Sequence, residues 1–231
     1  MPSTLLLLPG LLEDADAFEH QVKDLAGTAR VAVADLTRSD TIAGLAEDAL
    51  AQAGSETFSL AGHSMGGYVA LEIMRRAPER VERLALLNTH ARPDSPESTE
   101  NRRRLMALAE RDFPAVSAEL LPKIVAPRHL GEIGISGKVA GMALATGKDA
   151  FLRQERAIIG RIDSRPGLGA IRCPTLVVAG REDQIMPVEW LEELARGIPG
   201  ARLEVIEGCG HMASLEKPRE VAQLLRRWLE T

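Results

Sequence analysis

Short apolar runs alternate with longer amphipathic segments along most of this chain. The runs are apolar on successive positions, which is typical of parallel strands buried on both faces of a sheet. They predict strands at residues 4–8, 30–34, 57–61, 83–88, 175–179 and 202–206. Apolar residues at three- and four-residue spacing predict helices at residues 41–53, 65–76, 188–196 and 218–229. This alternation predicts an α/β fold, with a mostly parallel sheet of about six strands and covering helices.

The segment after the fourth predicted strand departs from this alternation. It shows no strand pattern, and its helical periodicity falls at residues 97–111, 115–125, 137–145 and 149–159. Turn-forming residues, rich in proline, mark both ends of the segment. We therefore expect residues 1–91 and 166–231 to form the core, and residues 92–165 to form a helical cap over the strand ends.

The composition narrows the possible functions. The 231 residues include 28 basic and 33 acidic side chains, a formal net charge of −5, so no basic field attracts nucleic acid or an anionic membrane. No apolar stretch approaches the roughly 20 residues that cross a bilayer, and residues 5–8 lack the basic flank of a signal peptide. We expect a cytoplasmic protein. Cys173 and Cys209 are expected to be packing thiols, because they fit neither a disulfide framework nor a metal site.

A Gly-x-Ser-x-Gly motif follows the third predicted strand, with Ser64 at its centre. The motif alone is weak evidence, but between a strand and a helix it has a mechanical reason. The serine sits in a tight turn, and Gly62 and Gly66 remove Cβ atoms that would collide with neighbouring segments. Its hydroxyl then stands at the N-terminus of a helix, where negative charge is favoured. A serine that only caps the helix would not explain both glycines, so we predict that Ser64 is a nucleophile.

A serine hydroxyl needs a base that removes its proton. His211 lies on a glycine-rich loop after the last predicted strand, at the same sheet edge as Ser64. The imidazole in turn needs a carboxylate at its other nitrogen. Asp183 follows the fifth predicted strand and gives the order Ser–Asp–His that the hydrolase fold predicts. Glu182 and Asp94 are the alternative acids, the first by its neighbouring position and the second by following the fourth strand.

Acyl transfer also needs donors for the developing oxyanion, usually two backbone amides. We predict the amide of Met65, directly after the nucleophile, and the amide of Leu11, in the loop after the first strand. His63 is adjacent to Ser64 and is expected to pack beneath the site or line its floor. His90 follows the fourth strand and could contact substrate. Because aromatic residues make up only 3% of the chain, aliphatic side chains should line the pocket, with Met142 and Ile158 as candidates that could equally pack in the core.

These motifs resemble the α/β-hydrolase superfamily, and more closely its group of small esterases, enol-lactonases and related enzymes with a helical cap. The matching motifs are residues 62–67, residues 180–183 with Pro187, and residues 208–211 with Glu216 and Pro218. The resemblance covers nearly the whole chain, with the cap matched only loosely. It implies a small-molecule substrate, no metal ion and no organic cofactor.

Two departures from this group concern the start of the chain. The group usually has His-Gly after its first core strand, whereas this chain has Pro9-Gly10. The histidine that commonly braces the oxyanion loop is therefore absent. The chain also begins almost directly with the first core strand, so we expect no preceding hairpin and a sheet of about six strands.

The leading interpretation is a hydrolase that cleaves small to medium carboxylic esters through an acyl-enzyme. A lactonase, a carbon–carbon hydrolase or a lyase could use the same triad, and a non-catalytic ligand receptor could retain it. Arginines in the predicted cap could hold a substrate carboxylate or form a solvated face. They are Arg102, Arg103, Arg104, Arg153, Arg156 and Arg161.

Overall fold

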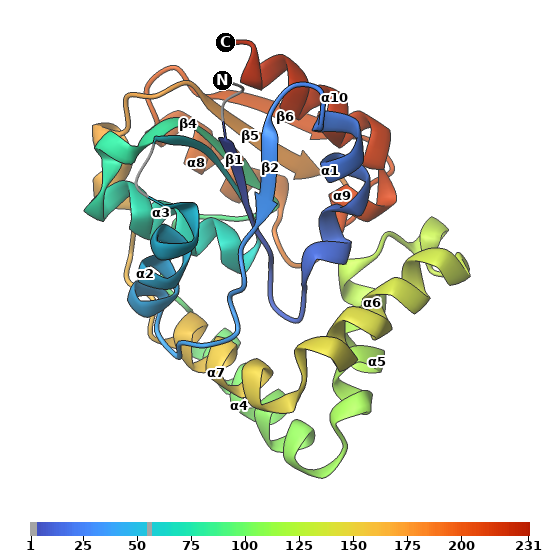
Figure 1. Ribbon diagram of the computed structural model, residues 1–231. Coiled ribbons are helices and arrows are strands. Elements are labelled where there is room, and N and C mark those ends of the chain that lie inside the picture. Colours follow the sequence, from blue (N-terminus) through green and yellow to red (C-terminus); the bar gives the residue numbers. More distant parts are fainter. Residues whose placement is uncertain (1–3, 55–56) are drawn as a thin grey trace.

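A single parallel sheet forms the centre of the molecule (Figure 1). The computed structural model describes residues 4–54 and 57–231. The strands run in the order β2-β1-β3-β4-β5-β6, and each neighbouring pair is parallel. Their bounds are β1 (Thr4–Leu8), β2 (Arg30–Val33), β3 (Phe58–His63), β4 (Val81–Leu87), β5 (Thr175–Gly180) and β6 (Arg202–Ile206). The six predicted strands are confirmed, and their carboxyl ends lie at one edge of the sheet.

Burial separates the central strands from the edge strands. Every residue of β1, β3 and β5 is buried, which matches their continuous apolar runs. In β2 and β6 exposed and half-buried residues predominate, because each of these strands has only one neighbour in the sheet. The loops that follow the central strands are therefore held on the most rigid part of the fold.

Helices cover both faces of the sheet. One apolar core lies between the sheet and α2 (Ile42–Ala53), α3 (Met65–Arg76) and α8 (Val188–Gly197). The other lies between the sheet and α1 (Glu19–Leu25) and α10 (Pro218–Leu229). Alternate residues of β1 pack into the two cores: Leu6 and Leu8 lie on one face of the sheet, and Leu5 and Leu7 lie on the other.

Two short helices on the α10 side were not predicted from the sequence. They are α1 and α9 (Ala213–Glu216). The buried Gln21 of α1 donates from Nε2 to the carbonyls of Ser214 and Pro218, at 3.2 and 3.1 Å. Tertiary packing therefore stabilises these helices, whose own sequences are too short to show a clear period. The remaining short elements are 3₁₀ turns at Ala15–Phe18, Pro78–Arg80, Pro127–His129 and Arg165–Ala170.

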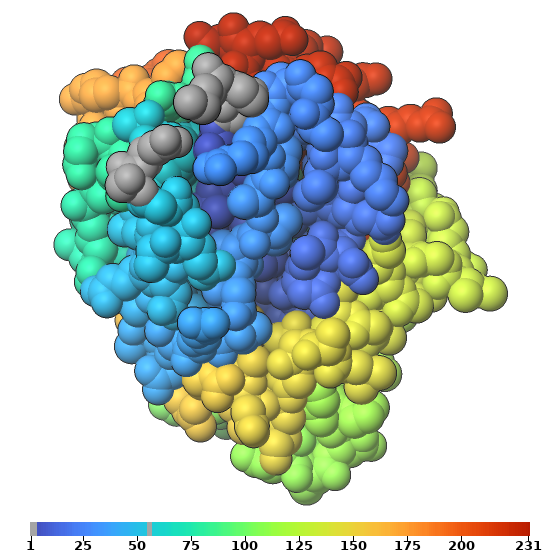
Figure 2. All heavy atoms as spheres, in the orientation of Figure 1, coloured from blue at the N-terminus to red at the C-terminus, as the bar shows by residue number. Residues whose placement is uncertain are grey.

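Four helices lie between β4 and β5 in the chain, as predicted, and gather beyond the carboxyl ends of the strands (Figures 1 and 2). They are α4 (Pro96–Arg111), α5 (Phe113–Ile124), α6 (Ile133–Thr146) and α7 (Lys148–Ile159), called the cap helices below. They share a small apolar cluster that includes Leu105, Val116 and Phe151, and Leu12 from the loop after β1 packs into it. Across the described residues, no helix combines the length and apolar character that a bilayer crossing needs.

Candidate active site

Ser64, Asp183 and His211 form one hydrogen-bonded chain above the carboxyl edge of the sheet. Ser64 follows β3, Asp183 follows β5 and His211 follows β6. Nε2 of His211 lies 2.9 Å from Oγ of Ser64, and Nδ1 lies 2.7 Å from Oδ2 of Asp183. The structure thus brings together the three side chains that the sequence predicted as a triad, from segments as far as 147 residues apart.

The turn at Ser64 explains the glycines of its motif. Ser64 has φ of 50° and ψ of −115°, a backbone conformation that L-residues rarely adopt. A Cβ at Gly62 would lie 2.4 Å from the carbonyl oxygen of Gly66, and a Cβ at Gly66 would lie 2.1 Å from that of Leu8. Both positions require glycine because backbone atoms, which cannot yield, occupy the space. This close packing places the serine hydroxyl at the start of α3.

Each carboxylate oxygen of Asp183 accepts two hydrogen bonds. Oδ1 accepts from the amides of Ile185 and Met186, at 2.8 and 2.9 Å. Oδ2 accepts from Nδ2 of Asn88 at 2.9 Å and faces Nδ1 of His211. Burial by itself would raise the pKa of this carboxyl group, but the adjacent imidazole and the donated hydrogen bonds outweigh it, so the pKa lies below its usual value. Asp183 therefore stays ionised while buried.

Glu182 and Asp94, the two alternative acids, pair with side chains other than His211. Glu182 forms an ion pair with Arg128. Asp94 accepts from Arg102 and Arg161, at 3.2 and 2.8 Å. Neither carboxylate contacts His211, so the geometry supports Asp183 as the partner of the imidazole.

Two residues that support this chain were not identified as functional from the sequence. Asn88, at the end of the predicted fourth strand, fixes Asp183 and also donates to the carbonyl of Gly210 at 3.2 Å. Glu216 accepts from the amides of Gly210 and Met212, at 3.0 and 3.1 Å, and so holds the loop that carries His211. Glu216 belongs to one of the motifs that resemble the family. Its contact with the His211 loop depends on the direction of its side chain, which a sequence does not show.

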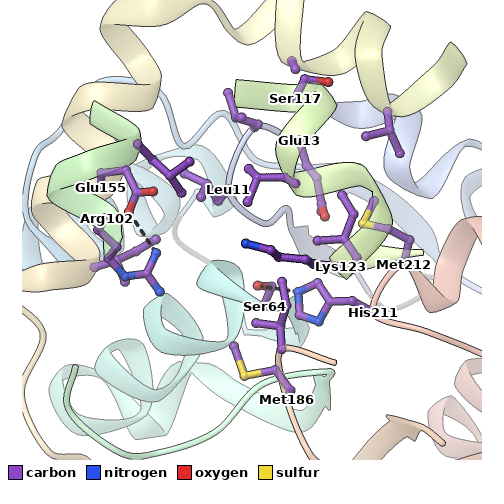
Figure 3. Close-up of a pocket in the computed structure, with 18 of the residues that line it drawn as sticks. Leu11, Glu13, Ser64, Arg102, Ser117, Lys123, Glu155, Met186, His211 and Met212 are labelled. Carbon is purple, nitrogen blue, oxygen red and sulfur yellow. Dashed lines mark hydrogen bonds and ion pairs between the residues drawn. The ribbon is translucent and has the colours of Figure 1, made fainter. Parts of the chain in front are cut away.

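A cavity of about 200 Å³ lies between the sheet edge and the cap helices (Figure 3). Ser64 and His211 line it, together with Met186 and Met212 from the core. Leucine, isoleucine, valine and alanine make up half of its other lining residues. Met142 of α6 and Ile158 of α7 both line it, where the sequence placed them as candidates. Polar groups enter from the cap, among them Lys123 and Arg102, and Figure 3 shows Lys123 extending into the cavity.

Arg102 belongs to a charge cluster on the wall of this cavity. It donates to Glu155 at 2.8 Å as well as to Asp94, and Glu155 is fully buried. Burial raises the pKa of Glu155, although Arg102 opposes the shift. Arg161, also buried, completes the cluster through Asp94. Arg102 and Arg161 thus form ion pairs within the cap helices and their approach, and Arg102 also lines the cavity, whereas Arg103 is exposed to solvent.

Two histidines predicted as substrate contacts lie away from the cavity lining. His63 is fully buried, and both of its ring nitrogens face protein groups: Glu13 at 2.9 Å and the carbonyl of His211 at 2.8 Å. His90 lies between Tyr68 and Trp190, with Nε2 3.1 Å from the Tyr68 hydroxyl. His63 therefore packs beneath the site, which is one of the two positions expected for it, and does not line the cavity. His90 faces Tyr68 of α3, so its placement does not support a substrate contact.

His90 makes a specific contribution to the pH dependence of stability. Burial, together with Arg161, Arg92 and Arg102, lowers its pKa from 6.5 to about 3, with Asp94 opposing the shift. The folded state therefore holds the ring neutral, whereas the unfolded chain protonates it below about pH 6.5. This stabilisation is complete above that pH and is lost as the pH falls toward 3.

We expect the free energy of unfolding in wild type to fall by roughly 2–3 kcal/mol more than in His90→Gln between pH 7.5 and pH 4.5. Glutamine can still donate to Tyr68 but does not titrate. Urea unfolding of both proteins at the two pH values measures this difference. Equal losses would show that His90 is not protonated preferentially in the unfolded state.

The two predicted oxyanion donors have suitable surroundings. Leu11 lines the cavity together with Ser64, and its amide has no hydrogen-bond partner among residues 4–54 and 57–231. Met65 is the first residue of α3, and amides in the first turn of a helix have no partner within the helix. For metals, the described part of the chain contains no group of three or more His, Cys, Asp or Glu side chains arranged to hold an ion.

Comparison with known proteins places this geometry in a family. Residues 5–224 match the Alpha/beta hydrolase family. A protein of Azorhizobium caulinodans proposed to be a carbamate hydrolase is 32% identical over 222 residues, which cover 92% of this chain and 82% of the relative. The 2-hydroxy-6-oxononadienedioate/2-hydroxy-6-oxononatrienedioate hydrolase of Klebsiella pneumoniae is 30% identical over 203 residues, covering 84% of this chain and 69% of the relative.

A solved structure extends the similarity over the full length. The thermophilic esterase from Thermogutta terrifontis superimposes with a TM-score of 0.92 and 31% sequence identity, covering 100% of this chain and 90% of the esterase. The fold, the serine motif and the sequence similarity therefore agree. The chain belongs to the alpha/beta hydrolase family.

Proposed function

We propose that this hydrolase cleaves small to medium carboxylic esters through an acyl-enzyme on Ser64. The observation that carries the proposal is the position of His211, whose two ring nitrogens lie 2.9 Å from the Ser64 hydroxyl and 2.7 Å from Asp183. Nε2 can accept the serine proton only if the ring proton is on Nδ1. The ionised Asp183 favours that tautomer and stabilises the imidazolium that forms.

The same residues account for both halves of the reaction. Ser64 attacks the ester carbonyl while His211 takes its proton, and the imidazolium then protonates the departing alkoxide. Water, deprotonated by His211, attacks the acyl-enzyme in the second half and releases the acid. The amides of Leu11 and Met65 would stabilise the oxyanion in each step.

The cavity supports substrates of limited size. Its volume of about 200 Å³ lies below the usual range for drug-sized ligands, roughly 300–1,000 Å³. Aliphatic side chains from α5, α6 and α7 form much of its wall, so the acyl or alcohol group should be apolar near the serine. In this proposal, residues 92–165 act as the cap that sets substrate size.

Cleavage of a carbon–carbon bond is the second candidate, favoured by the similarity to the Klebsiella pneumoniae hydrolase. It would use the same three side chains. The two functions differ in the leaving group, because cleavage of a diketone releases an enolate carbon where cleavage of an ester releases an alkoxide, and His211 would protonate either one.

A substrate panel distinguishes these functions. We expect p-nitrophenyl acetate and butyrate to be hydrolysed with kcat/KM of at least about 10⁴ M⁻¹ s⁻¹, and p-nitrophenyl octanoate more slowly. Vinylogous diketones, lactones and aryl carbamates complete the panel. Product analysis by mass spectrometry measures each reaction. Ester turnover at the buffer rate, together with rapid cleavage of another class, would transfer the assignment to that class, and no turnover of any class would favour a ligand receptor.

A further inference from the structure

Three consecutive backbone amides in the loop after β1 differ in their hydrogen-bond partners. The amide of Gly10 donates to Oε2 of Glu13 at 2.7 Å, and the amide of Leu12 donates to Oε1 of Gln154 at 3.1 Å. The Leu11 amide between them has no partner in the described part of the chain. Both acceptors are buried side chains. The neighbouring amides are therefore held in place, and only the middle one is available to a ligand in the cavity.

We propose that Glu13 and His63 are positioning residues that hold the Leu11 amide at the reacting carbonyl group. This inference rests on the proposed acyl transfer and deepens it, because it assigns the support of the oxyanion loop. Glu13 also lines the cavity, whereas His63 does not, but the proposed role requires neither side chain to touch the substrate. They act through the backbone of residues 10–12 and through the loop that carries His211.

Glu13 and His63 form a buried contact with the geometry of an ion pair. Nδ1 of His63 lies 2.9 Å from both carboxylate oxygens of Glu13, while Nε2 lies 2.8 Å from the carbonyl oxygen of His211. A carbonyl oxygen can only accept, so Nε2 carries a proton. Burial by itself would lower the pKa of His63, but the adjacent Glu13 raises it above its usual value. The proton on Nε2 and the raised pKa together favour a ring that donates from both nitrogens.

This arrangement connects the two halves of the site. One end of the ion pair holds Gly10 in the oxyanion loop, and the other holds the backbone of His211. A shift in either loop would break a charge-assisted hydrogen bond in a water-excluded position. The imidazole ring of His63 therefore links the loop of the free amide directly to the loop of the base.

The loop sequence fits this role. A Cβ at Gly10 would lie 2.9 Å from the Glu13 carboxyl carbon, so glycine makes room for the carboxylate. Leu12 has φ of 60°, a left-handed conformation that costs free energy in a non-glycine residue, and the bond to Gln154 of α7 holds it. Pro9 stands where related enzymes commonly carry a bracing histidine. In this chain the imidazole comes from position 63 and reaches the loop through Glu13.

Glu13→Ala tests the proposal by its effect on the transition state. We expect kcat for p-nitrophenyl butyrate to fall by about 10–100-fold, less than the loss of an oxyanion donor itself, with KM changed by less than about twofold. The inhibition constant of an alkyl trifluoromethyl ketone, which forms a tetrahedral adduct, should rise by about the same factor as kcat/KM falls. Glu13→Gln, which keeps an acceptor for Gly10, should recover part of the loss.

Glu72→Gln is the matched control, because Glu72 is also a buried carboxylate paired with basic side chains, yet it lies on α3 away from the cavity. It should retain wild-type kcat and inhibitor affinity. A kcat for Glu13→Ala within about twofold of wild type would overturn the proposal. So would a loss that Glu72→Gln reproduces.

A second measurement does not depend on turnover. In a ¹⁵N-labelled sample at pH 7, His63 should show two protonated ring nitrogens, and Glu13→Gln should convert it to a neutral ring. A neutral His63 in wild type would overturn the ion pair even if esters are cleaved. Failure of ester hydrolysis in wild type, with the two protonated nitrogens present, would instead count against the proposed reaction.

Discussion

Replacing Ser64 with alanine is expected to lower kcat/KM for p-nitrophenyl butyrate by about 10⁵-fold or more. The reason is that this change removes the hydroxyl that is hydrogen-bonded to Nε2 of His211, so no acyl-enzyme can form. The remaining rate would come from the oxyanion donors and from binding alone. Initial rates with enzyme purified separately from wild type measure the loss, since trace wild-type protein would mask it.

Ser59→Ala is the control for this substitution. Ser59 lies on the same strand, is fully buried and has no hydrogen-bond partner for its hydroxyl in the described structure. Its replacement should leave kcat/KM within about threefold of wild type. Equal rates for wild type and Ser64→Ala would remove Ser64 from the mechanism.

Asp183→Asn is expected to lower kcat by about 10³–10⁴-fold. Every group that faces the Asp183 carboxylate is a hydrogen-bond donor. These groups are the amides of Ile185 and Met186, Nδ2 of Asn88 and Nδ1 of His211. An amide has only one acceptor, so its NH₂ group must face donors in either orientation. Facing His211, it would favour the tautomer with the proton on Nε2, which cannot accept from Ser64. If the NH₂ group instead faced the amides of Ile185 and Met186, those buried donors would have no acceptor, which would lower the free energy of unfolding by roughly 1–3 kcal/mol.

Steady-state kinetics and thermal unfolding measure both consequences. Glu182→Gln is the matched control, because Glu182 is the adjacent acid and its carboxylate pairs with Arg128 away from His211. It should change kcat by less than about threefold. A similar loss in both variants, or a wild-type rate in Asp183→Asn, would contradict the role assigned to Asp183.

The sequence predicted the sheet and the three side chains that meet above it because each left a local signal. Continuous apolar runs marked the buried strands, and glycines with fixed spacing marked the turn at Ser64. The order of residues after parallel strands then placed Asp183 and His211 at one edge. These features depend on neighbours in sequence, so they could be predicted without coordinates.

The supporting residues could not be predicted in this way. Glu13 and His63 are 50 positions apart, and their contact depends on where two turns point their side chains. Arg102 lies on a polar stretch that is typical of a solvated helix face, yet it pairs with the buried Glu155 from another cap helix. Such pairs depend on how the cap helices pack against one another. The sequence predicts that these helices form, but not which of their residues face each other.

Rapid acid quench of wild type mixed with p-nitrophenyl butyrate tests the central claim most directly. Intact-protein and peptide mass spectrometry should find one butyryl group per chain, attached to Ser64, within the first turnover. Turnover of the ester with no acyl group on Ser64, or with the group on another residue, would contradict the account.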